Sequence, residues 1–504
     1  MIESPRPRHV RDKPIAALVD VIPESRVHGD GAALVRGITH DSRHVVPGDV
    51  YLARAGEHTH GIAHVDEAVR AGAVAVLTDR ASVARGVDAG VSAVVEVDDP
   101  RPVAGVAAAW VYDNPTDSMR VLGITGTNGK TTTAYLAEAG LQAAGHVTGL
   151  VGTVETRVGD LALPSVRTTP EATDLQGLFA LMREHGADAV AMEVSSHALA
   201  LDRIVGTRFA VAAFTNLSQD HLDFHRDLED YFAAKAQLFR AALADSAVVL
   251  VEDDWGRRLA ASVDIPLTTI GSADADWTIL PLEREALRLR GPDGAEHRIE
   301  VGLPGAFNLR NAALAYVALL ELGVPAEAAR DGIAAVRAVP GRMERIVAGQ
   351  PFTVLVDYAH TPDAVRLLLT EARDLAGDGG RVVVVLGCGG DRDRDKRPQM
   401  GAAAAEGADV AVLTSDNPRS EDPGTILEAM LAGVGPGARA TVVVDADRHS
   451  AIDQSIGLAR DGDVVVIAGK GHEQGQEFAG ETIPFDDRSV VRQALAAHGY
   501  GTAT

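Results

Sequence analysis

Short apolar segments alternate with helical segments from residue 119 onward. Four of the segments are apolar throughout, as expected of strands buried on both faces of a sheet, and they span residues 121–124, 189–192, 211–214 and 247–251. An Ala-rich segment with helical character, residues 131–144, follows the first of them. This alternation predicts an α/β fold in which helices cover both faces of a parallel sheet.

A similar alternation returns after residue 340. Its apolar segments span residues 353–356, 382–386, 410–413, 441–444 and 464–467. It predicts a second doubly wound sheet, smaller than the first and Rossmann-like. Between the two series, residues 280–303 alternate in a hairpin-like way around a turn at Gly291-Pro292-Asp293-Gly294, and residues 312–322 are predicted to form a helix.

The first 115 residues or so mix short strands and helices. Residues 73–77 and 91–97 have the pattern of buried strands, and Pro47-Gly48-Asp49 is a turn signal. Chain breakers at Tyr112-Asp113-Asn114-Pro115 and Val339-Pro340-Gly341 separate this part from the two series. A chain of 504 residues is too long for one core. We therefore expect three domains: a smaller N-terminal α/β domain at residues 1–116, a central domain at 117–339 and a C-terminal domain at 340–504.

Composition narrows the classes of partner. A formal net charge of −24 argues against non-specific binding to nucleic acid or to an anionic membrane. No apolar stretch approaches the roughly 18 residues that membrane insertion requires. The single cysteine, Cys388, excludes an internal disulfide and suits a reducing compartment, and its place after the strand at 382–386 favours a packing role. Because residues 1–14 contain no apolar leader segment, we expect a cytoplasmic protein.

The segment Gly126-Thr127-Asn128-Gly129-Lys130-Thr131-Thr132 joins the strand at 121–124 to the helix at 131–144. Glycines at such a junction let backbone N–H groups surround a phosphate; Lys130 adds a positive charge and Thr131 a hydroxyl for Mg²⁺. Ile124 stands where the usual phosphate loop has its first glycine, and a tight turn with a solvated lysine is the alternative. Strand, glycines, Lys-Thr and helix coincide here, which favours a nucleoside triphosphate and a P-loop ATPase-like central domain.

Two other strand ends in the central domain carry polar side chains. Glu193 ends the strand at 189–192, where ATPases of this type place a carboxylate that organises Mg²⁺, although a surface glutamate is the alternative. Residues 220–225 contain two aspartates and two histidines, and His221 could be a ligand, a base or a helix cap. Lys235, on a predicted helix face, is expected from the residues alone to face solvent.

Three strand ends in the C-terminal domain also carry mixed charges, at residues 357–362, 415–419 and 469–473. Ligands bind at the carboxyl ends of the strands in doubly wound sheets, so we expect these segments to converge. Asp416, Arg419 and Glu473 together offer both signs of charge, which suits an amino acid with its ammonium and carboxylate groups. Ordinary loop polarity explains any one of the three segments but poorly explains all of them.

These motifs resemble those of the Mur ligase family, and in particular its MurE-type branch, which adds the third amino acid to the peptidoglycan precursor. The phosphate loop at 126–131 matches the variant loop of that family, and residues 192–199 and 216–223 match its two central motifs. The resemblance covers almost the whole chain. It implies an ATP-dependent ligase in which an acyl phosphate forms on the substrate and an amine then displaces the phosphate.

The resemblance also implies roles for individual residues. Those implied to bind ATP are Gly126, Thr127, Asn128, Gly129, Lys130, Thr131, Thr132, Asn308, Arg342 and Asp357. Those implied in catalysis are Lys130, Glu193, His221 and Lys235, and Thr131, Glu193, His221 and Lys235 are implied to hold Mg²⁺. Lys235 matches a carbamylated lysine of the family, whose carbamate helps to place the metal. This reverses the expectation that Lys235 faces solvent.

Two further groups of residues are implied to bind the other substrates. The UDP end and the muramyl-peptide would contact Ser42, Thr168, Thr169, Ser195 and Arg203. The incoming amino acid would contact Arg392, Asp416, Asn417, Arg419, Gly469 and Glu473. The motif Asp416-Asn417-Pro418-Arg419 resembles that of enzymes that add meso-diaminopimelate, with Arg419 reading the far carboxylate. The chain departs from the family at Ala53-Arg54-Ala55-Gly56, where an apolar residue and a proline usually precede the glycine.

The implied reaction joins meso-diaminopimelate to the D-glutamate of UDP-MurNAc-L-Ala-D-Glu with ATP, and we expect a monomer without nucleic-acid partners. A lysine-adding relative or a folylpolyglutamate synthetase would use the same ATP chemistry. A P-loop switch that hydrolyses ATP without a condensation is a third alternative. The motif at 416–419 and the N-terminal domain disfavour the first two, and the converging strand ends at 353–473 disfavour the third.

Overall fold

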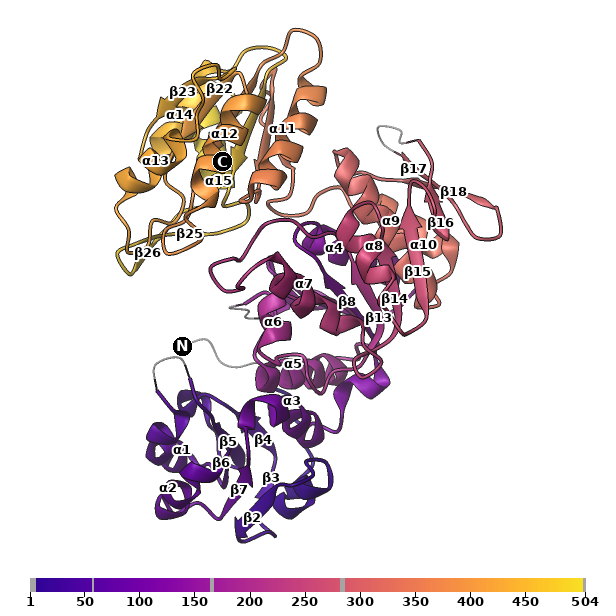
Figure 1. Cartoon of the computed structure of the whole chain (residues 1–504), viewed down its shortest axis with the longest axis vertical. Coiled ribbons are helices and arrows are strands. Elements are labelled where there is room, and N and C mark those ends of the chain that lie inside the picture. Colours follow the sequence, from indigo (N-terminus) through magenta and orange to yellow (C-terminus); the bar gives the residue numbers. More distant parts are fainter. Residues whose placement is uncertain (1–5, 57–58, 164–166, 282–285, 502–504) are drawn as a thin grey trace.

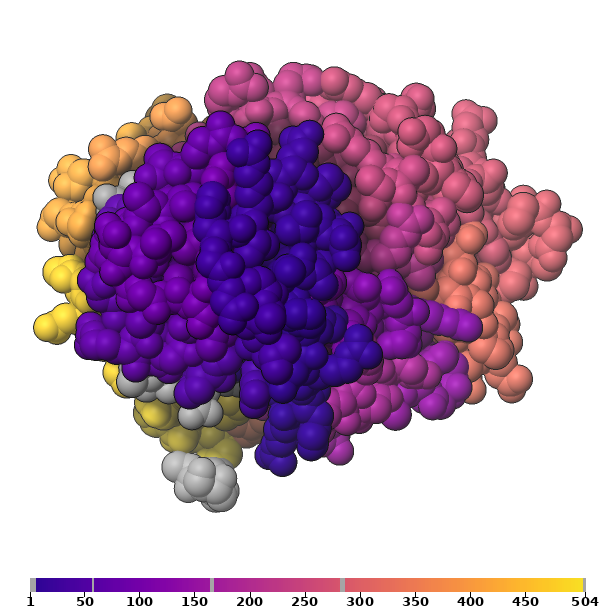
Figure 2. Space-filling model, turned by 90° about the horizontal axis from the view of Figure 1, so that it is seen from below, coloured from indigo at the N-terminus to yellow at the C-terminus, as the bar shows by residue number. Residues whose placement is uncertain are grey.

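The computed structural model describes residues 6–56, 59–163, 167–281 and 286–501. Three groups of strands form separate sheets, and the groups follow one another along the long axis of the molecule (Figure 1). Seen from the N-terminal end, the first group lies in front of the other two (Figure 2). In this part of the chain, no helix combines the length and the apolar character that crossing a membrane requires.

The central sheet has eleven strands in the order β11-β10-β9-β12-β8-β13-β14-β15-β16-β17-β18. Its strands are β8 (Arg120–Thr125), β9 (Thr148–Val151), β10 (Thr156–Val158), β11 (Leu161–Leu163), β12 (Ala189–Glu193), β13 (Phe209–Phe214), β14 (Ala244–Leu250), β15 (Leu267–Gly271), β16 (Trp277–Ile279), β17 (Ala286–Arg290) and β18 (Glu296–Glu300). The seven strands from β9 to β16 in this order pair in parallel, as predicted. Antiparallel strands extend both edges, and β17 with β18 forms the predicted hairpin; residues 282–285 of that prediction lie outside the described residues.

Helices cover both faces of this sheet. On one face lie α4 (Lys130–Ala143), α9 (Ala306–Glu321) and α10 (Ala326–Ala335), and on the other α5 (Ala172–Glu184), α6 (Ser196–Ala200), α7 (Leu228–Ala236) and α8 (Asp254–Ala260). In β12, Ala189 and Ala191 pack into the first apolar core, whereas Val190 and Met192 pack into the second. Because both sides of the strand are buried, the sequence is apolar without alternation.

The C-terminal sheet has six strands in the order β19-β20-β24-β21-β22-β23, and β19 alone of them runs antiparallel to its neighbour. The strands are β19 (Glu344–Ile346), β20 (Thr353–Asp357), β21 (Val382–Leu386), β22 (Val410–Leu413), β23 (Thr441–Val444) and β24 (Val464–Ala468). Helices α11 (Pro362–Ala376), α12 (Lys396–Gly407) and α13 (Pro423–Leu431) pack on one face, and α14 (Arg448–Leu458) and α15 (Asp487–Ala497) on the other. The doubly wound prediction is confirmed. Cys388 is buried in the first of these cores, as its predicted packing role requires.

The N-terminal sheet has five strands in the order β2-β7-β6-β5-β4. They are β2 (Arg26–Gly29), β4 (Gly37–Thr39), β5 (Asp49–Ala53), β6 (Ala75–Asp79) and β7 (Ala93–Val97), with helices α1 (Val65–Ala71), α2 (Val83–Asp88) and α3 (Pro100–Val111) around them. A short pair, β1 (Lys13–Pro14) with β3 (Leu34–Val35), and a hairpin of β25 (Gly475–Phe478) with β26 (Glu481–Pro484) complete the strands described. The domain boundaries after residues 116 and 339 stay predictions.

A buried ion pair braces the carboxyl end of the C-terminal sheet. The guanidinium of Arg448, at the start of α14, donates to both carboxylate oxygens of Asp487 at 2.8 and 2.7 Å, and both side chains are fully buried. The same guanidinium donates to the carbonyl oxygens of Ser415 at 3.3 Å and Ala468 at 3.0 Å. It thereby ties together the ends of β22 and β24. These are two of the strand ends that were predicted to carry a binding site.

We expect the substitution Asp487→Ala to lower the free energy of unfolding by about 3–5 kcal/mol, because it leaves the charge of Arg448 buried without a partner. Urea denaturation followed by circular dichroism measures the change. The control is Arg366→Ala, which removes a half-exposed pair with Asp363 in the same domain and should cost less than about 1 kcal/mol. Equal effects of the two substitutions would contradict the prediction.

Candidate active site

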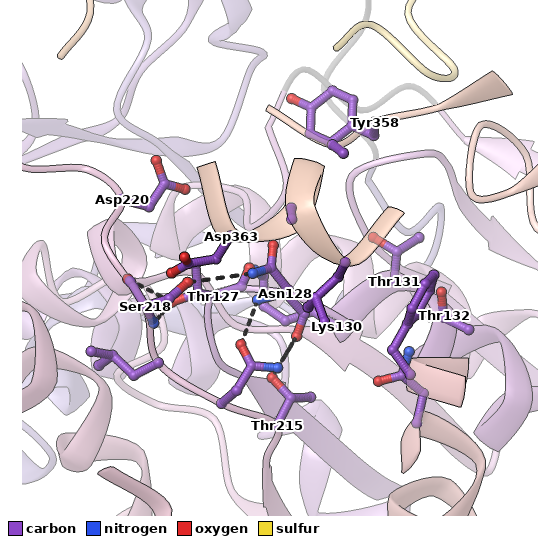
Figure 3. A pocket seen from close by; sticks show the side chains of 18 of the residues that line it. Thr127, Asn128, Lys130, Thr131, Thr132, Thr215, Ser218, Asp220, Tyr358 and Asp363 are labelled. Atoms are coloured by element: carbon purple, nitrogen blue, oxygen red, sulfur yellow. Dashed lines mark hydrogen bonds between the residues drawn. The ribbon is translucent and has the colours of Figure 1, made fainter. Parts of the chain in front are cut away.

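A cavity of about 620 Å³ lies between the central and C-terminal sheets, at the carboxyl ends of β8, β12 and β13. One wall is the phosphate loop, from Thr127 to Thr132, and the facing wall comes from α11 and the end of β20 (Figure 3). In that view Tyr358 lies apart from the loop, and Asp363 is drawn beside Thr127 and Asn128. The structure therefore brings the loop together with the C-terminal part of the chain.

The phosphate loop depends on two glycines. Gly126 and Gly129 have φ values of 145° and 89°, which disfavour residues with a side chain. A Cβ at Gly126 would lie 1.8 Å from the hydroxyl of Thr215. That hydroxyl donates to the carbonyl of Asn128 at 2.6 Å, and the side-chain oxygen of Asn216 accepts from the N–H of Asn128 at 3.0 Å. The segment after β13 thus fixes the shape of the loop.

Lys130, at the start of α4, lies folded over the loop. Its Nζ donates to the carbonyl oxygens of Gly126 at 2.9 Å and Thr127 at 2.8 Å. Burial lowers the pKa of this amine, and the nearby carboxylates of Glu193 and Asp220 oppose that shift. An incoming anion can replace the two carbonyl contacts and restore the charged form.

Glu193 is buried at the end of β12, and its carboxylate is held from two sides. Oε1 accepts from the hydroxyl of Thr131 at 2.9 Å and from the N–H of Thr153 at 2.8 Å, and Oε2 accepts from the hydroxyl of Thr153 at 3.0 Å. The backbone carbonyl of Glu193 accepts from Thr169 at 2.9 Å. The prediction of a carboxylate beside the phosphate loop is therefore confirmed in position.

Lys235 is 1% exposed, so the expectation from the residues alone that it faces solvent is wrong. Its Nζ donates to the carbonyl of Gly126 at 2.8 Å and lies 4.4 Å from the centre of the Tyr231 ring. Burial, reinforced by the charge of Lys130, lowers the pKa of Lys235 well below its ordinary value. The aromatic pair Tyr231-Phe232, also buried, was the one signal in the sequence that this helix face points inward.

The residues after β13 contact both the central and the C-terminal parts of the chain. Burial lowers the pKa of His221 to about 3, so its imidazole is neutral, and its ring lies 4.8 Å from that of His197. Burial opposes ionisation of Asp220, but His360, at 3.6 Å, and Lys396, at 3.8 Å, hold the pKa of its carboxyl well below the usual range. Both residues belong to the C-terminal part. Sequence reasoning assigned no role to either one.

The residues implied to contact ATP from farther along the chain take different positions. Arg342 donates to the hydroxyl of Thr131 at 3.0 Å and stacks over Tyr358, and Asp357 lines the cavity while accepting from two backbone N–H groups. Asn308 does not line the cavity. Its amide donates to Pro304 and its oxygen accepts from Asn311, which packs against Gly129.

The predicted convergence of strand ends in the C-terminal domain is confirmed for all three segments by direct contacts, since the N–H of Gly469 also donates to the carbonyl of Asp357 at 3.1 Å. The amide of Asn417 donates to Glu473 at 2.9 Å, and Gly469 lies so close to Asp416 that a Cβ would meet its carboxylate at 2.7 Å. Lys470, fully buried, donates to Asn417 at 2.9 Å and to Glu473 at 2.8 Å. Sequence reasoning quoted the segment that contains Lys470 but missed this bridging role.

Arg419 and Arg392 lie at the edge of this cluster. Arg419 has a left-handed backbone with a φ of 54°, donates to the carbonyl of Gly390 at 2.7 Å and pairs with Glu477 at 3.3 Å. Arg392 is more than half exposed and lies 3.8 Å from Asp223 of the central domain. His472, next to Glu473 in the chain, lies 3.2 Å from the carbonyl oxygen of Thr153. The cluster is therefore joined to the surroundings of Glu193.

The residues implied to bind the nucleotide-sugar substrate lie in two places. Ser42 lines a cavity of about 470 Å³ in the N-terminal domain, and its hydroxyl donates to Glu67 at 2.7 Å. Thr168 and Ser195 line the main cavity, where the N–H of Ser195 donates to the hydroxyl of Thr169. Arg203 pairs with Glu171, between the two cavities.

A metal site can be assessed from the donors present. Among the described residues, no group of three or more His, Cys, Asp or Glu side chains lies close enough to hold a metal ion. The hydroxyl of Thr131 and the carboxylate of Glu193 are in contact at 2.9 Å and are hard oxygen donors. Mg²⁺ sites in nucleotide-binding proteins commonly use one or two such donors together with substrate phosphates, so these residues fit that ion.

Sequence models of known families match three segments of the chain. The Mur ligase family, catalytic domain, matches residues 34–114; the Mur ligase middle domain matches residues 124–319; and the Mur ligase, glutamate ligase domain, matches residues 341–471.

Whole proteins similar to the chain cover nearly all of it. A Streptomyces coelicolor protein named UDP-N-acetylmuramoyl-L-alanyl-D-glutamate–2,6-diaminopimelate ligase is 51% identical over 97% of this chain and 98% of its own length. A protein of the same name from Corynebacterium glutamicum is 46% identical over 93% of each chain. A solved structure of a ligase with that name matches with a TM-score of 0.67 and 30% identity, over 97% of this chain and 100% of the other.

The buried amine of Lys235 predicts a pH-dependent stability. Its pKa is depressed in the folded chain, while in the unfolded chain it is near 10.4, so unfolding takes up protons in the pH range between these two pKa values. Relative to Lys235→Met, the free energy of unfolding of the unsubstituted protein should rise with pH up to about pH 10, by as much as about 1.4 kcal/mol per pH unit. Urea denaturation at several pH values in CO₂-free buffer measures it, and parallel pH profiles would contradict the prediction.

Proposed function

The chain belongs to the Mur ligase family, and we infer that it is an ATP-dependent ligase that joins meso-diaminopimelate to the D-glutamate of UDP-MurNAc-L-Ala-D-Glu, a step of peptidoglycan precursor synthesis. The observation that carries the proposal is the contact between the two halves of the site. His472 is next to Glu473 in the cluster of charged residues of the C-terminal domain, and its ring lies within reach of the carbonyl of Thr153. The N–H of Thr153 in turn donates to Glu193 beside the phosphate loop. An amine bound at the cluster is thus close to a carboxylate activated at the loop.

The reaction needs activation because a carboxylate oxygen is too poor a leaving group for an amine to displace. In the proposed reaction the γ-carboxylate of the substrate's D-glutamate attacks the γ-phosphorus of ATP, forming an acyl phosphate and releasing ADP. The amine of diaminopimelate then attacks the acyl carbon and phosphate leaves. Both steps depend on positioning and on neutralising negative charge, which the site offers in place of acid–base groups.

The phosphate loop supplies the positive environment. Its N–H groups and the start of α4 face the β- and γ-phosphates, and Lys130 exchanges its contacts with the carbonyls of Gly126 and Thr127 for contacts with phosphate oxygens. Thr131 and Glu193 would hold Mg²⁺, with His221 and the carbamate of Lys235 on the neighbouring side. When bound, the ion neutralises charge that develops on the phosphate oxygens.

The carbamate of Lys235 follows from the state of its amine. Only a neutral amine adds CO₂, and each addition releases one proton to form the carbamate. Burial and the charge of Lys130 lower the pKa of Lys235, which raises the neutral fraction of the amine and favours this reaction. The carbamate turns a buried base into an anion beside Lys130, and this supports a role in orienting the cations of the site.

The cluster in the C-terminal domain provides for both ends of diaminopimelate. Asp416 and Glu473 can accept from an ammonium group, while Asn417 and Arg419 can donate to a carboxylate. Diaminopimelate differs from lysine by one carboxylate at its far end. A guanidinium that binds this carboxylate favours diaminopimelate over lysine, because lysine cannot make the same charge-assisted hydrogen bond.

The function is tested by phosphate release from ATP and Mg²⁺ with UDP-MurNAc-L-Ala-D-Glu in the presence of meso-diaminopimelate, L-lysine or no amino acid. We expect release only with diaminopimelate, together with a tripeptide product by mass spectrometry. Lys130→Ala should lower the rate by more than about 100-fold while leaving the thermal unfolding midpoint within a few degrees, because it removes a charge that the transition state needs.

Other outcomes of this assay are informative. Turnover with lysine alone would keep the ligase chemistry and overturn the substrate. Equal release without any amino acid would indicate a nucleotide hydrolase and contradict the condensation. Substantial residual ligation by Lys130→Ala would remove the proposed role of that residue.

The role of Arg419 makes a separate prediction. Arg419→Leu should raise KM for meso-diaminopimelate by about 10- to 100-fold and leave that for ATP unchanged, because a charge-assisted contact to the far carboxylate is lost. The matched control is Arg394→Leu, an exposed arginine of the same domain that pairs with Glu421. A variant at 419 whose ratio of kcat/KM for diaminopimelate over lysine equals that of the control would contradict the role.

A further inference from the structure

The segment in which the chain departs from its family, Ala53-Arg54-Ala55-Gly56, places a guanidinium between the N-terminal and central domains. Arg54 directly follows β5, and its side chain is 18% exposed. Its Nη2 lies 3.1 Å from Oε2 of Glu171, which immediately precedes α5 of the central domain. Arg54 therefore forms an ion pair between the two domains, which the apolar residue usual at this position in the family could not form.

One carboxylate is shared by more arginines than it can neutralise. Glu171 accepts from Arg54 and lies 2.9 Å from Nη2 of Arg203, and Arg167 also pairs with it. Burial opposes ionisation of this carboxyl, and the surrounding cations still lower its pKa. Arg54 and Arg203 alone present two positive charges to this one carboxylate, which leaves an excess of positive charge at this point.

Two other carboxylates lie nearby. Asp202 interacts with Arg101, whose guanidinium also donates to the carbonyl of Ala55 at 3.4 Å. Asp99, in contrast, acts on Arg54 and accepts from the backbone N–H of Arg101. Asp99 therefore offsets part of the excess around Glu171. Nε of Arg203 is buried and has no hydrogen-bond partner within the described parts of the chain. A buried donor without an acceptor destabilises the folded chain, and a ligand that supplies an acceptor removes this cost.

The excess charge lies beside the cavity that contains Ser42. Arg54 lines that cavity and also a small pocket that contains Glu171, the carboxylate that pairs with Arg203. Glu171 follows Thr169 by two residues, and Thr169 donates to the carbonyl of Glu193 in the main cavity. Arg54 and Arg203 are therefore positioned near the N-terminal side of a ligand that extends from Ser42 toward the phosphate loop.

We propose that Arg54 is a further substrate-binding residue of this chain and that, with Arg203, it holds the diphosphate of the nucleotide-sugar substrate. The inference rests on the proposed function for the identity of the substrate. A diphosphate fits because its oxygens can accept from two guanidiniums at once, including the unpartnered Nε of Arg203. Glu171 keeps both arginines in place without substrate and competes with the phosphates for them.

The test compares the dissociation constants of UDP and uridine, measured by ligand-observed NMR titration on the full chain. Arg54→Gln should raise the dissociation constant of UDP by about 10- to 100-fold and change that of uridine by less than about twofold, because only the charge-assisted phosphate contact is lost. The matched control is Arg80→Gln, an exposed arginine of the same domain that pairs with Glu96. The control should change neither constant.

A second variant separates phosphate binding from a purely structural ion pair. Glu171→Gln removes the competing carboxylate while keeping a side chain of the same size, so it should lower the dissociation constant of UDP by several-fold. If the Arg54–Glu171 pair only joined the domains, Glu171→Gln and Arg54→Gln would both weaken UDP, and that result would overturn the proposal. So would equal losses for UDP and uridine in Arg54→Gln, or no loss for either.

These outcomes are distinct from a failure of the proposed function. Ligase activity of the unsubstituted chain combined with full UDP affinity in Arg54→Gln would remove the role of Arg54 alone. No ligase activity, combined with loss of UDP but not uridine affinity in Arg54→Gln, would support a diphosphate site and remove the proposed reaction.

Discussion

The close approach of the phosphate loop to the segment after β13 is the constraint on which the rest of the site depends. The space that a side chain on Gly126 would need is taken by the hydroxyl of Thr215, and the carbonyl of Gly126 is the acceptor for both Lys130 and Lys235. The amines of Lys130 and Lys235 thus donate to the same backbone oxygen, and the tight turn of the loop places that oxygen within reach of both. The lowered pKa of Lys235 follows from this geometry, because the amine is buried and because the charge of Lys130 repels a second charge beside it.

The active site is assembled from residues that separate sheets contribute. Arg342 reaches Thr131, and His360 and Lys396 lie close to Asp220, while Phe307 of α9 packs against the apolar core of the C-terminal sheet. The polar contacts exchange more readily with water and with ligands than the apolar contact does. The second step of the proposed reaction requires such an exchange because the amine must approach the acyl carbon.

Much of the fold was predictable because its strands are buried on both faces, and a run such as residues 382–386 admits few other structures. The phosphate loop and Glu193 were predictable because strand ends in such sheets point to one edge. Lys235 was not, since its burial depends on a carbonyl 109 residues away in sequence. Lys470 was missed for the same reason. Its partner Asn417 is 53 residues away in sequence, and the two meet only because β22 and β24 lie in one sheet. Periodicity reports which face of an element is apolar, and it contains no information about which polar groups meet across elements.

Helix α5 belongs to two apolar cores at once. Ala172 and Ala180 pack with α3 in the N-terminal core, while Leu175 and Phe179 pack in the core of the central sheet. The Ser42 cavity and the phosphate loop are consequently parts of one frame that is joined through a shared, buried helix, and such packing favours a constant span between them. Such a frame acts as a ruler: a molecule anchored at one end presents its carboxylate at the other only if its length matches the span. Shorter or longer nucleotide-linked peptides would be rejected by their size, even where every chemical group that they offer is correct.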